Sequence, residues 1–241
     1  MLFKRKIYDK FLTWKNETAG QKALLIEGAR RIGKSTVVEE FAKNEYKSYI
    51  LIDFARASGN VKDYFREHLN DLDTFFMLLS VEYGVTLYPR QSVIIFDEVQ
   101  MFPKAREAIK YLVADGRYDY METGSLISIK ENVKDIVIPS EERHIRMYPL
   151  DFEEFCWALG EAPLMDYIRA CFDKKEPLER SLHNKAMLVW GQYLLVGGMP
   201  MSIVAFIEGH KDFGKADLEK RDILELYRND IMKIKAQYRS K

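Results

Sequence analysis

The chain has 241 residues, of which 47% are hydrophobic and 31% are charged, with no long low-complexity tract. This composition excludes a disordered or fibrous protein and fits one large α/β domain, or one domain with a small appendage. Lysine plus arginine equals aspartate plus glutamate at 37 each, so the whole chain offers no broad basic field for nucleic acid. A local basic patch stays compatible with these numbers.

The cysteines and the apolar runs indicate the cellular compartment of the protein. Cys156 and Cys171 are fifteen residues apart and form no C-x-x-C pair, which argues against a zinc site and against a disulfide framework. No stretch approaches the ~20 apolar residues of a membrane span, and no apolar run follows the charged start at residues 1–6. We expect a cytoplasmic protein that does not associate with membranes.

Helices and strands are expected to alternate in the first 150 residues. A short helix within residues 1–20 precedes the strand-like runs and helical patterns. The expected strands are Ala23–Glu27, Ser48–Asp53, Ser92–Asp97, Asp119–Thr123 and His144–Tyr148, and the clearest helices are Lys34–Asn44 and, after Pro103, Lys104–Asp115. Short apolar strands separated by amphipathic helices are typical of a parallel, doubly wound α/β sheet.

The character of the sequence changes after Pro149. Apolar residues return at helical spacing in Phe152, Phe155, Cys156 and Leu159, and no further strand is expected. The later helices are interrupted at Gly160, Pro177, Gly197–Gly198 and Pro200. We therefore expect a core over residues 1–150 and a helical subdomain over residues 151–241.

A phosphate-binding motif follows the first strand. Residues 28–35 match G-x-x-x-x-G-K-[ST], and a predicted strand precedes the motif while a predicted helix follows it. In this motif, backbone N–H groups converge on phosphate oxygens, the lysine reaches the β- and γ-phosphates, and the last hydroxyl ligates Mg²⁺. The candidate nucleotide-binding residues are Gly28, Ala29, Arg30, Arg31, Ile32, Gly33, Lys34, Ser35 and Thr36.

Two acidic residues end the most apolar of the predicted strands. Asp97 is placed to hold Mg²⁺ or its water, together with the Ser35 hydroxyl. Glu98 follows directly and is the candidate catalytic residue that orients and deprotonates a water attacking the γ-phosphate. With Lys34 as the cation on the phosphates, this arrangement favours ATP hydrolysis over phosphate transfer to a small molecule.

A third element contributes hydroxyl groups at the end of the fourth predicted strand. Thr123 and Ser125 are both candidates to touch the γ-phosphate or the attacking water, and a simple turn is nearly as good an interpretation for either one. An arginine for the transition state is expected but not identified by the sequence. Arg117, Arg143 and Arg146 are the candidates, because we interpret them as following core strands, although a solvated surface arginine is the better interpretation of each.

Taken in order, these motifs resemble those of a prokaryotic AAA-type ATPase family. The matching segments are the phosphate loop, Ile95–Gln100, Thr123–Ser125, Met147–Phe155, Val196–Pro200 and Leu226–Ile231. The resemblance implies a P-loop NTPase core of five parallel strands in the order 5-1-4-3-2, Glu98 as the catalytic acid, and a helical lid. It also implies a further C-terminal domain of unknown function, and because the chain stops at Ser240–Lys241 inside a helical pattern, we expect it to be truncated before that domain.

Three functions remain open at this point. The leading hypothesis is an Mg²⁺-dependent ATPase that switches an attached or partner domain. The second is a nucleotide-gated binding module with little turnover, whose partner is a protein or nucleic acid, and the third is a small-molecule phosphotransferase. GTP is disfavoured because no Asn-Lys-x-Asp segment is present, whereas self-association is favoured by the AAA-type resemblance. Tyr8 is a candidate for adenine recognition, but an ordinary role in the core is the better interpretation of its ring.

Overall fold

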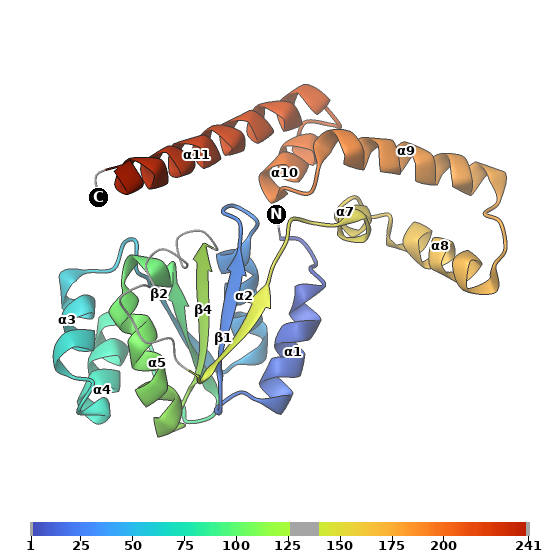
Figure 1. The fold of residues 1–241 in the computed structure, drawn as a ribbon. Helices are drawn as coiled ribbons and strands as arrows, with labels where there is room; N and C mark the ends of the chain where they lie inside the picture. The colour runs from blue at the N-terminus through green and yellow to red at the C-terminus, as the bar shows by residue number, and fades with distance from the viewer. Residues whose placement is uncertain (1, 126–139, 240–241) are drawn as a thin grey trace. The chain divides into compact units, whose positions relative to one another are not determined.

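A computed structural model describes residues 2–125 and 140–239 of the chain (Figure 1). The chain divides into two compact units. One unit is Lys6–Tyr148, and the other combines Met1–Arg5 with Pro149–Lys241. That residues 1–150 and 151–241 act as separate domains stays a prediction.

The unit Lys6–Tyr148 is built on a five-stranded parallel sheet (Figure 1). The strands are β1 (Ala23–Gly28), β2 (Ser48–Asp53), β3 (Ser92–Asp97), β4 (Asp119–Ser125) and β5 (Glu142–Arg146). Their order is β2-β3-β4-β1-β5, which is the expected order 5-1-4-3-2 counted from the other edge. The predicted fold class is therefore confirmed.

Helices connect these strands and cover the sheet. They are α1 (Ile7–Glu17), α2 (Lys34–Glu45), α3 (Gly59–Glu67), α4 (Leu72–Tyr83) and α5 (Pro103–Asp115), with the short 3₁₀ helix η1 (Val99–Met101). Local signals explain their ends. Asp71 accepts a hydrogen bond from the Thr74 N–H at 3.2 Å and so caps α4, while Pro103 opens α5 and Gly116 ends it with a φ of 74°.

An aromatic cluster fills the core where α3, α4 and α5 pack against the sheet. The ring of Phe65 lies 5.0 Å from that of Phe75 and 5.5 Å from that of Phe96, each edge to face. Phe54 joins them directly after β2, at 1% exposure. Burying such side chains contributes about 1.5–3 kcal/mol each, which fixes the strands that carry the phosphate loop and the acidic residues.

Two strands have boundaries that differ from the sequence prediction by two residues, and β1 ends one residue later than expected, at Gly28. β5 covers Glu142–Arg146 instead of His144–Tyr148, and β4 continues through Gly124 and Ser125. No apolar run marks the start of β5, because its first residue is a buried carboxylate, which is paired with an arginine of α5. The end of β4 is likewise unmarked, because glycine and serine carry no strand signal, although both are buried here.

The second unit is helical in its described part. Its helices are α7 (Phe152–Ala158), α8 (Ala162–Lys174), α9 (Arg180–Val196), α10 (Pro200–Glu208) and α11 (Phe213–Arg239). Asp151 and Glu154 form a reciprocal capping box at the start of α7. The predicted interruptions at Gly160, Pro177 and Gly197–Gly198 fall between helices, whereas Pro200 is the first residue of α10. Ser240 and Lys241, on which the expected truncation rests, lie outside the described residues.

A close backbone contact joins two distant segments of this helical unit. The Leu150 N–H donates a hydrogen bond to the Gly198 carbonyl at 2.7 Å, and a side chain at position 198 would collide with the Leu150 carbonyl. Glycine is therefore required there by space. At the other end, Arg5 pairs with Glu154 at 3.2 Å, which ties the first residues of the chain to α7. Within residues 2–125 and 140–239, no single helix has the length and apolar character to cross a membrane, and only α9 and α10 together, bent by 119°, meet that criterion.

Candidate nucleotide-binding site

The phosphate loop lies between the carboxyl end of β1 and the start of α2. Gly33 precedes α2 with a φ of 88°, a conformation that glycine adopts without steric cost. Gly28 has almost no free space, because a Cβ there would lie 2.5 Å from the Met147 carbonyl oxygen and 2.6 Å from Ile32 Cδ1. Both glycines of the motif are thus required by geometry.

Lys34 is held inside this loop. Its Nζ donates to the carbonyl oxygens of Ala29 at 2.8 Å and Gly28 at 3.2 Å, and its side chain is largely buried. Burial lowers the pKa of the Lys34 ammonium, and the negative charges of Glu98 and Asp97 oppose that shift. The lysine therefore lies within electrostatic reach of both acidic residues at the end of β3.

Ser35 and Asp97 meet although 62 residues separate them in the chain. The Ser35 hydroxyl donates to Asp97 Oδ1 at 2.6 Å, and the Thr123 hydroxyl donates to the same oxygen. Asp97 is 7% exposed and Thr123 is fully buried. Three elements, α2, β3 and β4, thus present their hydroxyl and carboxylate oxygens to one point.

Glu98 is fixed by its backbone as well as by its side chain. Its φ of 53° is in the left-handed region, which costs a residue other than glycine about 1 kcal/mol or more. Its N–H donates to Thr123 Oγ1 at 3.3 Å, and Gln100 Nε2 donates to Glu98 Oε2. We call Lys34, Ser35, Asp97, Glu98 and Thr123 the phosphate-loop cluster.

The remaining candidate residues lie around this cluster with varied exposure. Ala29, Arg31 and Thr36 are exposed, Arg30 is partly exposed and Ile32 is buried. Ser125 is buried and lies opposite Gly28 in the pairing of β4 with β1. Of the two hydroxyl candidates on β4, it is Thr123 that contacts Asp97 and Glu98.

Gln100 was assigned no role from the sequence, although it belongs to the segment that carries the acidic residues. A glutamine two positions after a glutamate gives no recognisable signal by itself. Only the 3₁₀ turn after β3, which begins at the left-handed Glu98, brings the two side chains together.

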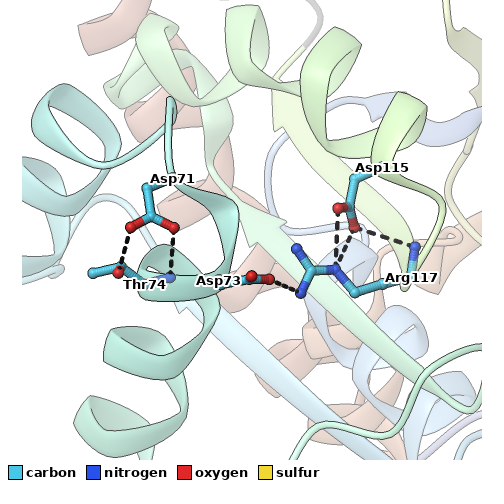
Figure 2. Close-up of polar contacts among 5 residues, drawn as sticks. All are labelled: Asp71, Asp73, Thr74, Asp115 and Arg117. Atoms are coloured by element: carbon cyan, nitrogen blue, oxygen red, sulfur yellow. Dashed lines mark hydrogen bonds and ion pairs between the residues drawn. The ribbon is translucent and has the colours of Figure 1, made fainter.

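Arg117 does not follow a core strand, which corrects our interpretation of the sequence. It precedes β4, at the amino ends of the parallel strands, whereas the phosphate loop lies at their carboxyl ends. Figure 2 shows its guanidinium between Asp73 of α4 and Asp115, with Nη1 to Asp73 Oδ1 at 2.6 Å and Nε to Asp115 Oδ2 at 2.8 Å. These contacts join α4 to the end of α5.

The other arginine candidates lie within β5 and do not follow it. Arg143 is 3.6 Å from Glu17, and Arg146 is exposed opposite Glu27, next to the phosphate loop. Tyr8 packs its ring edge to face against Phe41 at 5.1 Å. That contact is the ordinary core role expected for this tyrosine.

A second polar cluster lies between α5 and the strands β4 and β5. Arg106 donates to both carboxylate oxygens of Glu142, at 2.8 Å and 2.6 Å, and His144 Nε2 is 3.1 Å from Glu142 Oε2. Glu122 is fully buried beside them, and neither of its carboxylate oxygens has a hydrogen-bond partner at ordinary distance among the described residues. We call Arg106, Glu122, Glu142 and His144 the β5 cluster.

The β5 cluster changes the pKa of its members in opposite directions. Burial raises the pKa of Glu122 well above its ordinary value, and the charge of Glu142 adds to that shift. Burial also opposes ionisation of Glu142, but hydrogen bonds from Arg106 and His144 outweigh it and lower the pKa of Glu142. Hydrogen bonds to Glu142 and Glu27 raise the pKa of His144 to about 9.

Comparison with known proteins gives the family. The family model described as an AAA domain matches residues 20–156, which is more than half of the chain. The chain therefore belongs to this AAA domain family, and membership supports nucleotide binding and, in general terms, hydrolysis. No curated protein matches the chain.

Solved structures of longer proteins resemble the chain at low sequence identity. PCH-2 of C. elegans is 12% identical with a TM-score of 0.42, and the match covers 93% of this chain and 66% of that one. DnaA of Aquifex aeolicus bound to AMPPCP is 13% identical with a TM-score of 0.43, covering 95% and 67%. Hsp104 with ATPγS and FITC-casein is 15% identical with a TM-score of 0.47, covering 83% and 35%. The chain thus spans from about a third to two thirds of these proteins.

Proposed function

We propose that the protein is an Mg²⁺-dependent ATPase. The observation that carries this proposal is the 2.6 Å hydrogen bond between the Ser35 hydroxyl and Asp97 Oδ1. It joins the last residue of the phosphate loop to the acidic residue that ends β3, as a shared Mg²⁺ site requires. Membership of the AAA domain family supports the nucleotide part of the proposal.

The donor set fits magnesium. Hydroxyl and carboxylate oxygens are the ligands that Mg²⁺ prefers, and Ser35 and Asp97 present one of each, close together. Bound there, the ion would neutralise phosphate charge as the γ-phosphate leaves. The N–H groups of the loop that leads into α2, and those of the first residues of α2, would hold the phosphates by their own dipoles.

Two side chains take the chemical roles in this proposal. Lys34 would neutralise charge on the β- and γ-phosphates, since its ammonium is already directed into the loop. Glu98 would accept a proton from the attacking water, because its carboxylate lies beside the loop within electrostatic reach of Lys34. Ser125, at the end of β4 opposite Gly28, is proposed as an additional contact to the γ-phosphate or the water.

The biological setting is also part of the proposal. ATP hydrolysis would switch an attached C-terminal domain or a partner, and self-association would bring an arginine from a neighbouring copy to the phosphates. The buried thiols of Cys156 and Cys171 are free, as suits a protein of the cytoplasm.

The test is ATP binding and hydrolysis by the purified chain with Mg²⁺, at several protein concentrations, beside Lys34→Ala and Glu98→Gln. We expect Lys34→Ala to weaken ATP binding by at least about 100-fold, because it removes the loop's cation. Glu98→Gln is expected to keep ATP binding and lose at least about 100-fold in turnover. A rise in turnover per subunit with concentration would support the arginine from a neighbouring copy.

Matched controls use the same changes on the surface of the same unit. Lys110→Ala and Glu67→Gln alter exposed residues of α5 and α3 and should leave both binding and turnover unchanged. Undiminished turnover in Glu98→Gln would refute the role of Glu98. Tight ATP binding with no turnover at any concentration would replace the ATPase by the nucleotide-gated binding module.

A further inference from the structure

Gln100 lies next to the proposed general base on a rigid support. It follows Glu98 in η1, whose backbone closes with a 2.8 Å hydrogen bond from the Met101 N–H to the Glu98 carbonyl. Val99 anchors this turn in the core at 1% exposure, and Gln100 itself is 5% exposed. The side chain of Gln100 therefore starts from a fixed point, under cover from solvent.

The backbone of Glu98 is fixed, but its side chain has three rotatable bonds. The N–H of Glu98 is bound to Thr123, and its left-handed conformation aims the side chain out of the strand's regular alternation. A glutamate that is free to rotate spends most of its time away from any one position, and ordering it costs up to about 2 kcal/mol. A contact to the carboxylate itself is needed to remove this freedom.

Gln100 supplies that contact, since its Nε2 donates to Glu98 Oε2. The negative charge of Glu98 acts on the Lys34 ammonium and opposes the lowering of its pKa, and that ammonium is itself bound in the phosphate loop. The donor is a neutral amide, which orients a carboxylate without adding a positive charge that would compete for the phosphates.

We propose that Gln100 is a positioning residue for ATP hydrolysis, which holds the Glu98 carboxylate toward the phosphate loop through its amide. This inference rests on the proposed function of Glu98. In this role Gln100 acts through the Glu98 carboxylate, to which its amide donates. Its effect is therefore expected on turnover and not on ATP binding, because a misplacement of about 1 Å at a reacting group can cost up to ~100-fold in rate.

The test replaces Gln100 by methionine, which keeps the length and burial of the side chain but removes the hydrogen-bond donor. We expect Gln100→Met to lower kcat by about 10- to 100-fold, with the Kd for ATP and the KM within about twofold of the unsubstituted protein. In the Glu98→Gln background the same substitution should lower kcat no further, because the two side chains act as one unit. Gln91→Met, at an exposed glutamine just before β3, is the control and should leave kcat unchanged.

The outcomes separate this inference from the proposed function. Unchanged kcat in Gln100→Met, while Glu98→Gln loses turnover, would overturn the role of Gln100 alone. Undiminished turnover in Glu98→Gln would overturn the proposed role of Glu98 and this inference with it. If Gln100→Met lost its thermal unfolding transition, Gln100→Leu, which is apolar, of similar volume and without a hydrogen-bond donor, would be measured in its place. Wild-type kcat in that variant would likewise overturn the inference.

Discussion

The phosphate-loop cluster and the β5 cluster use similar residues on the same sheet in opposite ways. At the phosphate loop, Asp97 accepts from two neutral hydroxyls, those of Ser35 and Thr123, and no arginine neutralises it in the contacts described above. In the β5 cluster, Glu142 accepts two hydrogen bonds from one arginine, and both side chains are almost fully buried. The Asp97 carboxylate can still bind a cationic ligand, whereas the negative charge of Glu142 is already neutralised by Arg106 and stabilises the fold.

This difference gives a way to separate functional from structural polar residues. Hydroxyls are neutral donors, so they orient a carboxylate without reducing its attraction for cations. An arginine that donates two hydrogen bonds neutralises the carboxylate and occupies both of its oxygens. Substitutions in the phosphate-loop cluster should therefore change ATP binding or turnover more than stability. Substitutions in the β5 cluster should do the reverse.

The largest expected effect is on stability, from Arg106→Met. The substitution leaves the carboxylate of Glu142 buried without its arginine, and breaking a buried pair in this way costs about 3–5 kcal/mol. Urea unfolding would measure the loss in the free energy of unfolding. The control is Arg66→Met, which breaks an exposed pair with Asp63 of similar length and should cost less than about 1 kcal/mol. Equal losses of unfolding free energy in Arg106→Met and Arg66→Met would contradict the structural role assigned to the β5 cluster.

A smaller effect is expected from Glu122→Gln, and its sign depends on pH. Burial raises the folded-state pKa of Glu122 above its unfolded value, so its contribution to stability is complete below the unfolded pKa and is lost as pH rises toward the folded value. Glutamine has the same shape and does not titrate. We expect the free energy of unfolding of the variant to exceed that of the unsubstituted protein by at least about 1 kcal/mol at pH 8, and by a smaller amount at pH 5.

Thermal unfolding at the two pH values would check the prediction for Glu122. The matched control is Glu67→Gln on the exposed end of α3, which should show no such pH dependence. A Glu122→Gln protein that lost stability equally at pH 5 and pH 8 would mean that the carboxylate is ionised and paired in the fold.

The smallest effect concerns His144. Hydrogen bonds to Glu142 and Glu27 raise its folded-state pKa to about 9, so its contribution is complete below its unfolded pKa of 6.5 and is lost as pH rises through about 9. Its side chain is 41% exposed, so solvent screening limits the contribution to about 1 kcal/mol or less. The difference in unfolding free energy between the unsubstituted protein and His144→Gln should therefore be larger at pH 6 than at pH 9.5. A difference that grew with pH would contradict this assignment.

A strand is predicted well from the sequence when it carries a continuous apolar run. Ser92–Asp97 is buried at all six positions and was predicted with its observed bounds, because a continuous apolar run has few other interpretations. β5 was shifted by two residues, since its first residue is charged and its burial depends on Arg106, which comes from another element. A partner that folding brings from 36 residues away leaves no local pattern.

The candidate site divides in the same way. The phosphate loop and the acidic pair follow from short motifs, whose spacing reflects a local geometry of strand, loop and helix. The hydrogen bond of Thr123 to Asp97 depends on the register of β4 beside β3, and the contact of Gln100 with Glu98 depends on one left-handed residue. Both are set by backbone geometry that the sequence does not encode in a recognisable pattern.

The close approach of Met147 to Gly28 has a consequence for how this chain can vary. The Met147 N–H donates to the Glu27 carbonyl at 2.8 Å, and its own carbonyl oxygen lies where a side chain at position 28 would begin. The backbone after β5 therefore packs directly against Gly28, the first residue of the phosphate loop. An inserted or deleted residue between Arg146 and Pro149 would displace that carbonyl and so disturb the backbone of the phosphate loop. The number of residues in this segment is therefore constrained in the same way as the spacing of the loop motif.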